Sequence, residues 1–335
     1  MAQLLTSSGG LSGQYQKYFN KKLLTAVLQK LVMDQFGQQA TLPGGMGSVI
    51  VRWTRPDAPD RTQVQALSEG TPLATDRAYT YSFVDATLAQ VGEKTTISDI
   101  LSATNLFDTL ERVSVLMGQE AAHYFDFAIT TEIVAGVASG SKQYSGGATD
   151  FASLVALPAA DSVLTIQDLL KAITRLEIAR APTAEPNERV PNAKGGEYVA
   201  VIPPAIGYNL KQDAKFIDAG VRGNNEGLFN GEYGSWYGVR CIMGTLPWRE
   251  ATGGAEGTYS STGGVYSTIV TGSEQFGVAS LTSQSISKPQ LIVCSKPDKS
   301  DQLGQFTSVG WKSFFKVKTL KDDWAVVIRS QTTYA

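Results

Sequence analysis

The sequence contains very few of the residues that usually build a catalytic or metal site. Its 335 residues include two cysteines and a single histidine. Cys241 and Cys294 lie far apart and form no CxxC pair, so neither a zinc site nor a disulfide framework is predicted. We expect both to be small buried residues in a reducing compartment. His123 has no GxSxG motif in the chain to supply a nucleophile, so a hydrolytic triad is not predicted.

Motifs for phosphate binding and acid–base catalysis are missing as well. The glycine-rich stretch Gly44–Ser48 has no lysine after it and precedes a strand-like run, whereas phosphate-binding loops precede a helix. The carboxylates are scattered, so no pair stands out for general acid–base catalysis. We therefore expect no catalytic residue, no cofactor and no metal ion, and the chain is not predicted to be an enzyme.

Charged residues are scarce and nearly balanced. They make up 18% of the sequence, and the formal net charge is −2. This balance lacks the cationic field of a dedicated nucleic-acid binder, and it leaves room only for weak contact with DNA. It favours a chain that buries much of its surface against copies of itself, although an ordinary enzyme can have the same composition. No apolar run reaches the roughly 18 residues of a membrane span, and no signal-peptide pattern opens the chain.

Apolar periodicity predicts helices within an α+β chain. One helix is expected within residues 15–32, with lysines largely off its apolar stripe. A second, unusually long helix is expected from an N-cap at Asn105 to about Val137. A third is expected over Ile166–Arg180, with Leu170 among its core-facing residues. The apolar stripe of the first helix consists of Tyr15, Phe19, Leu23, Leu24, Val27, Leu28, Leu31 and Val32.

Strand patterns fill much of the remaining chain. Val49–Trp53 and residues 79–97 predict the two arms of a long β-hairpin, and the polar stretch between them predicts its extended tip. The glycine-rich segment 251–264 is expected to be exposed. Further strands are expected at Glu197–Pro203, in a hairpin within 227–248, and near Leu291–Cys294, Phe314–Leu320 and Ala325–Ser330.

The order of these pieces resembles the Hong Kong 97 capsid fold of tailed bacteriophages. Local sequence is similar to the capsid proteins of the N-four-like podovirus family, in YFNKKLLTAV, EYGSWYGVRCIM, VYSTIVTGSEQFGVASL and the stretches 67–99 and 301–329. The resemblance implies five parts: an N-terminal arm at 1–47, the E-loop β-hairpin with P-domain strands at 48–97, the P-domain spine helix at 98–139, an inserted A-domain at 140–290, and C-terminal P-domain strands at 291–335.

This resemblance implies a major capsid protein that self-assembles, as hexamers and pentamers, into the icosahedral shell around a phage genome. It implies assembly in the host cytoplasm, residence in the virion, and scaffolding, portal and decoration proteins as partners. Packaged double-stranded DNA would make weak, non-specific contact. Two alternatives remain: an encapsulin-like nanocompartment shell with the same fold, and an extracellular hydrolase, against which the missing signal peptide and lone histidine count.

Contacts between subunits are expected from the hairpin and the arm. Charged residues in and around the polar tip are predicted to form ion pairs between subunits, and the apolar stripe of the arm is predicted to contact a neighbour. The candidates are Arg55, Arg61, Glu69, Asp76 and Arg77 in the hairpin, and Phe19 and Leu23 in the arm.

Overall fold

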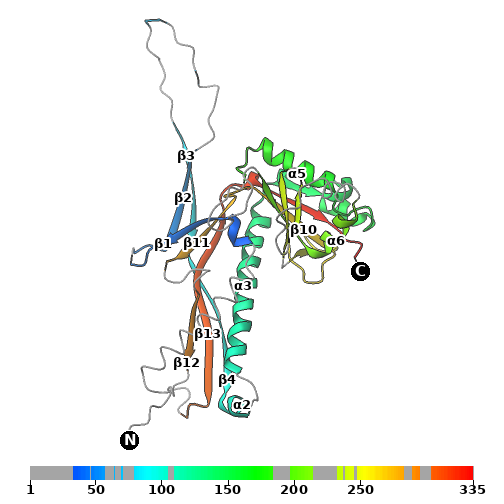
Figure 1. Cartoon of the computed structure of the whole chain (residues 1–335). Coiled ribbons are helices and arrows are strands. Elements are labelled where there is room, and N and C mark those ends of the chain that lie inside the picture. The colour runs from blue at the N-terminus through cyan, green and yellow to red at the C-terminus, as the bar shows by residue number, and fades with distance from the viewer. Residues whose placement is uncertain are drawn as a thin grey trace.

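The computed structural model arranges the chain as an elongated body with a second body beside one end of its long helix (Figure 1). The described strands form a five-stranded sheet, a seven-stranded sheet and a two-stranded hairpin. The structure describes residues 33–45, 47–56, 64, 69–70, 79–104, 109–183, 197–213, 232–236, 238–244, 247–282, 289–294 and 303–334.

The elongated body is a sheet with one long helix on its face. Helix α3 (Thr109–Gly136) packs on β13 (Phe306–Thr319), whose alternating side chains point to the helix and are buried. The Phe125 ring meets Trp311 and Phe315 edge-to-face, at centroid distances of 5.6 and 5.1 Å. Strand β13 lies between β4 (Ala89–Ser98) on one side and β11 (Phe276–Leu281) and β12 (Gln290–Cys294) on the other, and β1 (Gln38–Leu42) extends the sheet beyond β11.

The second body is built on the seven-stranded sheet. Helix α5 (Ile166–Ile178) packs on its central strands and begins with a capping box between Thr165 and Asp168. The strands are β5 (Lys142–Tyr144), β14 (Ala325–Ser330), β10 (Val265–Thr271), β6 (Tyr198–Ile202), β8 (Val239–Met243) and β7 (Glu232–Trp236) in spatial order, with β9 (Trp248–Glu250) also on β10. The other helices are α4 (Phe151–Ala156) and α6 (Pro204–Gln212).

The hairpin consists of β2 (Ile50–Pro56) and β3 (Tyr81–Thr87), which pair antiparallel. Only the first half of the predicted arm 79–97 is therefore confirmed, because its second half forms β4 and pairs with β13 in the five-stranded sheet. Strand β3 leads directly into β4, so the hairpin continues the long axis of the five-stranded sheet. The short helix α2 (Asp99–Thr104) follows β4 at the opposite end of the body (Figure 1). The described residues also form the 3-10 turns η1 (Met33–Phe36), η3 (Ser139–Ser141), η4 (Ser145–Gly147) and η5 (Asp322–Trp324).

The long helix, the third predicted helix and most of the predicted strands are confirmed, but several elements were missed, including strand β5 and helix α4. Strands β1, β10 and β11 have no counterpart in the prediction; β10 and β11 are buried along nearly their whole length, so they lack the apolar–polar alternation that marks a half-exposed strand. The predicted N-cap Asn105 and the predicted helix within 15–32 lie outside the described residues. Cys241 is buried, but the expected burial of Cys294 is wrong, since this residue is exposed near the end of β12.

The sheets do not divide where the predicted domains do. Strand β11 belongs to the segment 140–290 but lies in the five-stranded sheet, and β14 belongs to 291–335 but lies inside the seven-stranded sheet. The chain therefore passes between the two bodies more often than a simple insertion requires. Leu170, predicted to face the core, is 39% exposed on α5.

The segment 251–264 is largely exposed, as the sequence predicts, but an ion network around the buried Arg329 fastens it to the sheet. Arg329 of β14 is buried, and its Nε lies 3.1 Å from both carboxylate oxygens of Glu250. The Glu256 carboxylate lies 3.1 Å from the Arg329 Nη1 and 3.0 Å from the Lys142 Nζ. Tyr259, from the same segment, packs against Phe127 of α3 with a centroid distance of 4.8 Å. The segment thus joins the seven-stranded sheet to the long helix.

This network predicts a loss of stability in acid. Partial burial favours the neutral form of Glu256, but the hydrogen bond from Lys142 and the charge of Arg329 outweigh it, so the pKa lies below its ordinary value. A carboxyl with a lowered pKa in the folded state contributes stability above its unfolded pKa and loses it as the pH falls. Urea unfolding at pH 7 and pH 4 should therefore show a larger acid-induced loss for the natural chain than for Glu256→Gln. Equal losses would contradict the assignment.

Candidate assembly surfaces

One face of the hairpin is anchored to its own chain. The side chains of Val51, Trp53 and Arg55 alternate with exposed neighbours and are half-buried. The Trp53 ring lies so close to Gly277 of β11 that a Cβ atom built there would be 2.6 Å from the indole Cζ2. A glycine is therefore needed at this contact, because any larger residue would push the hairpin away from the sheet.

Arg55, a predicted contact between subunits, lies at this anchor. Its Nη1 donates a hydrogen bond of 3.1 Å to the carbonyl of Leu320, and its guanidinium lies 4.3 Å from the centre of the Trp324 ring. Burial lowers the pKa of Arg55, and the charge of Glu274 partly opposes that shift. In the single chain Arg55 thus fixes the loop end of the hairpin strands.

The other face of the hairpin is open and carries apolar side chains. Ile50, Tyr81 and Phe83 are exposed there, with 59% of Phe83 accessible. Between them Arg52 and Asp85 form two hydrogen bonds of 2.6 and 2.7 Å across the strands. These bonds raise the pKa of Arg52 and lower the pKa of Asp85, so both remain charged and paired. The result is an apolar face whose charges are already neutralised, as a protein-binding surface requires.

A second apolar surface lies at the far tip of the elongated body, beside α2 (Figure 1). The backbone N–H of Asp99 donates to the carbonyl of Gln305 at 2.9 Å, which brings α2 next to the start of β13. Four large apolar side chains are exposed there, and Leu303 is 81% accessible: Ile100, Leu101, Leu303 and Phe306.

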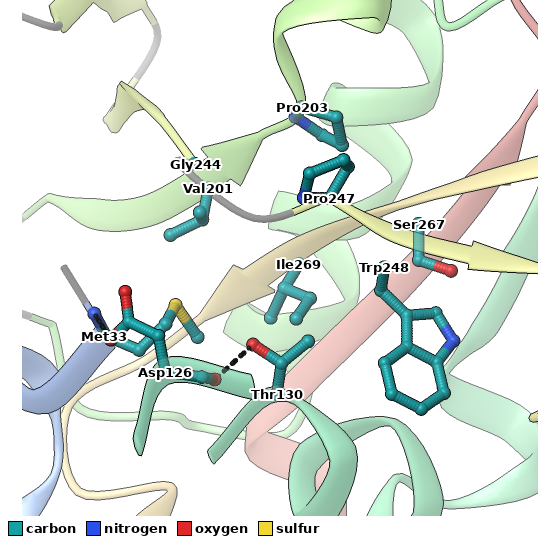
Figure 2. Close-up of a pocket in the computed structure, with 10 residues that line it drawn as sticks. All are labelled: Met33, Asp126, Thr130, Val201, Pro203, Gly244, Pro247, Trp248, Ser267 and Ile269. Atoms are coloured by element: carbon teal, nitrogen blue, oxygen red, sulfur yellow. Dashed lines mark hydrogen bonds between the residues drawn. The ribbon is translucent and has the colours of Figure 1, made fainter. Parts of the chain in front are cut away.

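The root of the N-terminal arm lies between the two bodies. The backbone N–H of Met33 donates to the Asp126 carboxylate at 3.2 Å, and the Thr130 hydroxyl donates to the Asp126 carbonyl at 2.8 Å. Figure 2 shows these residues beside Trp248 and Ile269, around a cavity of about 20 Å³. That volume admits about one water molecule, so the cavity is no substrate site.

A larger groove among the described residues offers no catalytic constellation either. An open groove of about 680 Å³ runs along α5, lined by Leu170, Lys171, Arg175 and Ile178 with Asp323 opposite. Its charged groups are spread along a helix face, with no nucleophile beside a base. Among the described residues, no three potential metal ligands lie together, and no helix is long and apolar enough to cross a membrane.

The predicted contact residues are only partly placed. Glu69 lies in an exposed turn with Gly70, and its role stays a prediction. The candidates Arg61, Asp76, Arg77, Phe19 and Leu23 lie outside the described residues. The sequence analysis missed the Arg52–Asp85 pair and the apolar tip. Opposite charges at matching positions of the predicted hairpin, and Ile100–Leu101 directly after Asp99, were the available signals.

Comparisons with known proteins point to one fold. No protein-family model and no curated protein matches the chain. The capsid of the cyanophage P-SCSP1u is similar, with 18% identity and a TM-score of 0.62 over 90% of this chain and 89% of that one. The capsid of Ralstonia phage GP4 gives 13% identity and a TM-score of 0.65 over 91% and 92%. A virus-like particle from Pyrococcus furiosus gives 10% identity and a TM-score of 0.53, over 94% of this chain and 99% of that chain.

These likenesses extend over nearly the whole length of both chains, so they concern the complete arrangement of helices and sheets. The chain therefore has the Hong Kong 97 fold of phage capsid proteins.

Proposed function

We propose that the chain is a major capsid protein, a shell subunit that self-assembles around a phage genome and is not an enzyme. The observation that carries this proposal is the pair of apolar surfaces at opposite ends of an elongated body, one on the hairpin and one beside α2. A subunit that contacts neighbours at both ends can build a closed shell from repeated copies.

The hairpin supports the proposal further. A two-stranded sheet is marginal in water, and this one is held to its own chain by only one face. Its open face gains stability when it lies on a neighbouring subunit. Closed rings of five and six copies would supply that neighbour.

Several finer features belong to the same proposal. We infer membership of the N-four-like podovirus group and assembly in the host cytoplasm with scaffolding, portal and decoration proteins. The arm (1–47), E-loop and P-domain strands (48–97), spine helix (98–139), A-domain (140–290) and closing strands (291–335) remain the proposed parts. Two strands lie outside the sheet of their own part: β11 of the proposed A-domain lies in the five-stranded sheet, and β14 of the closing strands lies in the seven-stranded sheet.

The alternative is an encapsulin-like shell that houses proteins instead of a genome. The likeness to a virus-like particle from Pyrococcus furiosus favours keeping this candidate, because the fold alone does not separate it from a phage capsid. The contents of purified particles discriminate: nuclease-protected DNA supports the capsid, and a co-purifying enzyme supports the nanocompartment.

The proposal is tested by electron microscopy of the full chain, expressed with and without its neighbouring genes. Uniform icosahedral shells, or rings of five or six copies, are the expected result. A monodisperse monomer under both conditions would overturn the shell function.

A substitution on the open hairpin face should separate assembly from folding. Phe83→Asp places a charge in the middle of the exposed apolar face, where a neighbour would have to bury it at a high cost. We expect the variant to keep its circular dichroism spectrum and melting temperature but to lose shells in electron micrographs. Thr54→Asp, at the cross-strand partner of Phe83, is the control that distinguishes loss of the aromatic ring from added charge alone. Normal shells from Phe83→Asp would remove the hairpin face from the interface.

A further inference from the structure

The five-stranded sheet has a second face, opposite the one that packs on α3. On strand β13 the odd-numbered residues Trp311 and Phe315 point to the helix, where both rings contact Phe125. Side chains alternate along a strand, so the even-numbered residues of β13 point to the second face. Lys94 of β4 belongs to the same face, because it lies directly opposite Gly310 in the register of the two strands.

Three lysines follow one another along this second face. Lys312 and Lys316 are four residues apart on β13, so their Cα atoms are separated by about 13 Å. Lys94 lies diagonally across from Lys312, at about 8 Å. Lys94 and Lys316 are exposed, and Lys312 is half-buried. The three residues form a row about 20 Å long, which we call the lysine row.

No described carboxylate on this face neutralises the lysine row. Among the described residues, the other side chains that β4, β12 and β13 place here are uncharged, except for Lys318 near the end of β13. Lys318 is already paired, since its Nζ lies 3.1 Å from the Glu132 carboxylate. The lysine row therefore concentrates three positive charges on one face, although the whole chain has a formal net charge of −2.

The chemistry of this face suits a phosphate backbone better than a protein partner. Protein interfaces have an apolar centre, whereas nucleic-acid interfaces are more polar and more positively charged. Among the described residues of this face, only Phe306, at the far end of β13, is a large exposed apolar side chain. Thr96 and Ser308 lie opposite each other on β4 and β13, and their hydroxyls are of the kind that bind phosphate oxygens.

We propose that the lysine row binds the phosphate backbone of double-stranded DNA without reading its sequence. The choice of DNA as the polyanion rests on the proposed function, because a subunit that encloses a genome meets DNA at high local concentration. Duplex DNA carries one negative charge per about 1.7 Å of its axis, so a row about 20 Å long faces about 12 phosphates. Three contacts give weak binding that is sensitive to salt, which agrees with the nearly balanced charge of the chain.

Binding of a short fluorescent DNA duplex to the unassembled full chain, followed by anisotropy, tests the proposal. The logarithm of the affinity falls with the logarithm of the salt concentration by about 0.9 per neutralised phosphate, so three contacts predict a loss of about 40-fold between about 50 and 200 mM salt. Lys312→Gln and Lys316→Gln should each reduce this slope by about 0.9. Lys171→Gln removes an exposed lysine from α5 and is the matched control, which should leave the slope unchanged.

An unchanged slope in the triple variant of Lys94, Lys312 and Lys316 to glutamine, or no binding at about 50 mM salt, would overturn the proposal. Polyglutamate that binds as tightly as the duplex would replace DNA by an acidic protein as the occupant. In purified shells, acetylation of the lysine row should be slower when DNA is inside, and equal rates in filled and empty shells would also contradict the proposal. Natural shells without DNA contact at the row contradict only this inference, whereas a natural chain that forms no shells overturns the proposed function.

Discussion

Replacing Glu250 by glutamine is expected to lower the free energy of unfolding by about 3–5 kcal/mol, because it leaves the buried guanidinium of Arg329 without its main counter-charge. Glutamine keeps an acceptor for the Trp248 indole, which donates to Glu250 at 3.1 Å. The loss therefore reports the Arg329–Glu250 pairing and not the hydrogen bond of the indole. Urea unfolding followed by tryptophan fluorescence measures it.

The matched control is the double variant Glu250→Gln with Arg329→Met. Removing both charges removes the cost of an unpaired buried ion, so the double variant should be more stable than Glu250→Gln alone. The single variant Arg329→Met is measured as well. If the loss of stability in the double variant equals the sum of the losses in Glu250→Gln and Arg329→Met, the two side chains are not coupled, and the network does not hold the segment 251–264 as described.

Replacing Phe125 by alanine should cost about 3–5 kcal/mol, because the ring is fully buried and its removal leaves a cavity between α3 and β13. Tyr124→Ala is the matched control. It removes an aromatic ring from the adjacent position, but 45% of that side chain is already accessible, so we expect a loss of about 1 kcal/mol or less. Thermal unfolding of both variants compares them directly. Similar losses would mean that the sheet does not use Phe125 as its main contact with the helix.

Local periodicity explains which parts of the fold could be predicted. The long helix, α5 and the hairpin carry repeats of about 3.6 or two residues that are visible in the sequence alone. Strands β10 and β11 carry no such signal, since both of their faces are buried. Nothing local indicates that β14 pairs with β10 and β5, because that pairing joins segments about 60 and 185 residues apart.

The candidate surfaces, too, could be predicted only where a local pattern marks them and not where distant contacts decide them. Hairpin pairing could be predicted, and with it which side chains share a face, but not which face lies on the sheet. That choice depends on Trp53 packing against Gly277, a contact between segments far apart in the chain. The Arg329–Glu250 pair, separated by 79 residues, was likewise invisible in the sequence.

The position of β13 and β14 has a consequence for synthesis. Each strand follows all the other described strands of its sheet in the chain, and each is paired on both sides. While a ribosome is still adding these residues, neither sheet has its central strand, so neither body can complete its fold. A truncated chain therefore lacks the framework that holds the hairpin and the tip in place. Chains whose synthesis stops before β13 and β14 therefore cannot fold completely, and they cannot join an assembly of folded subunits.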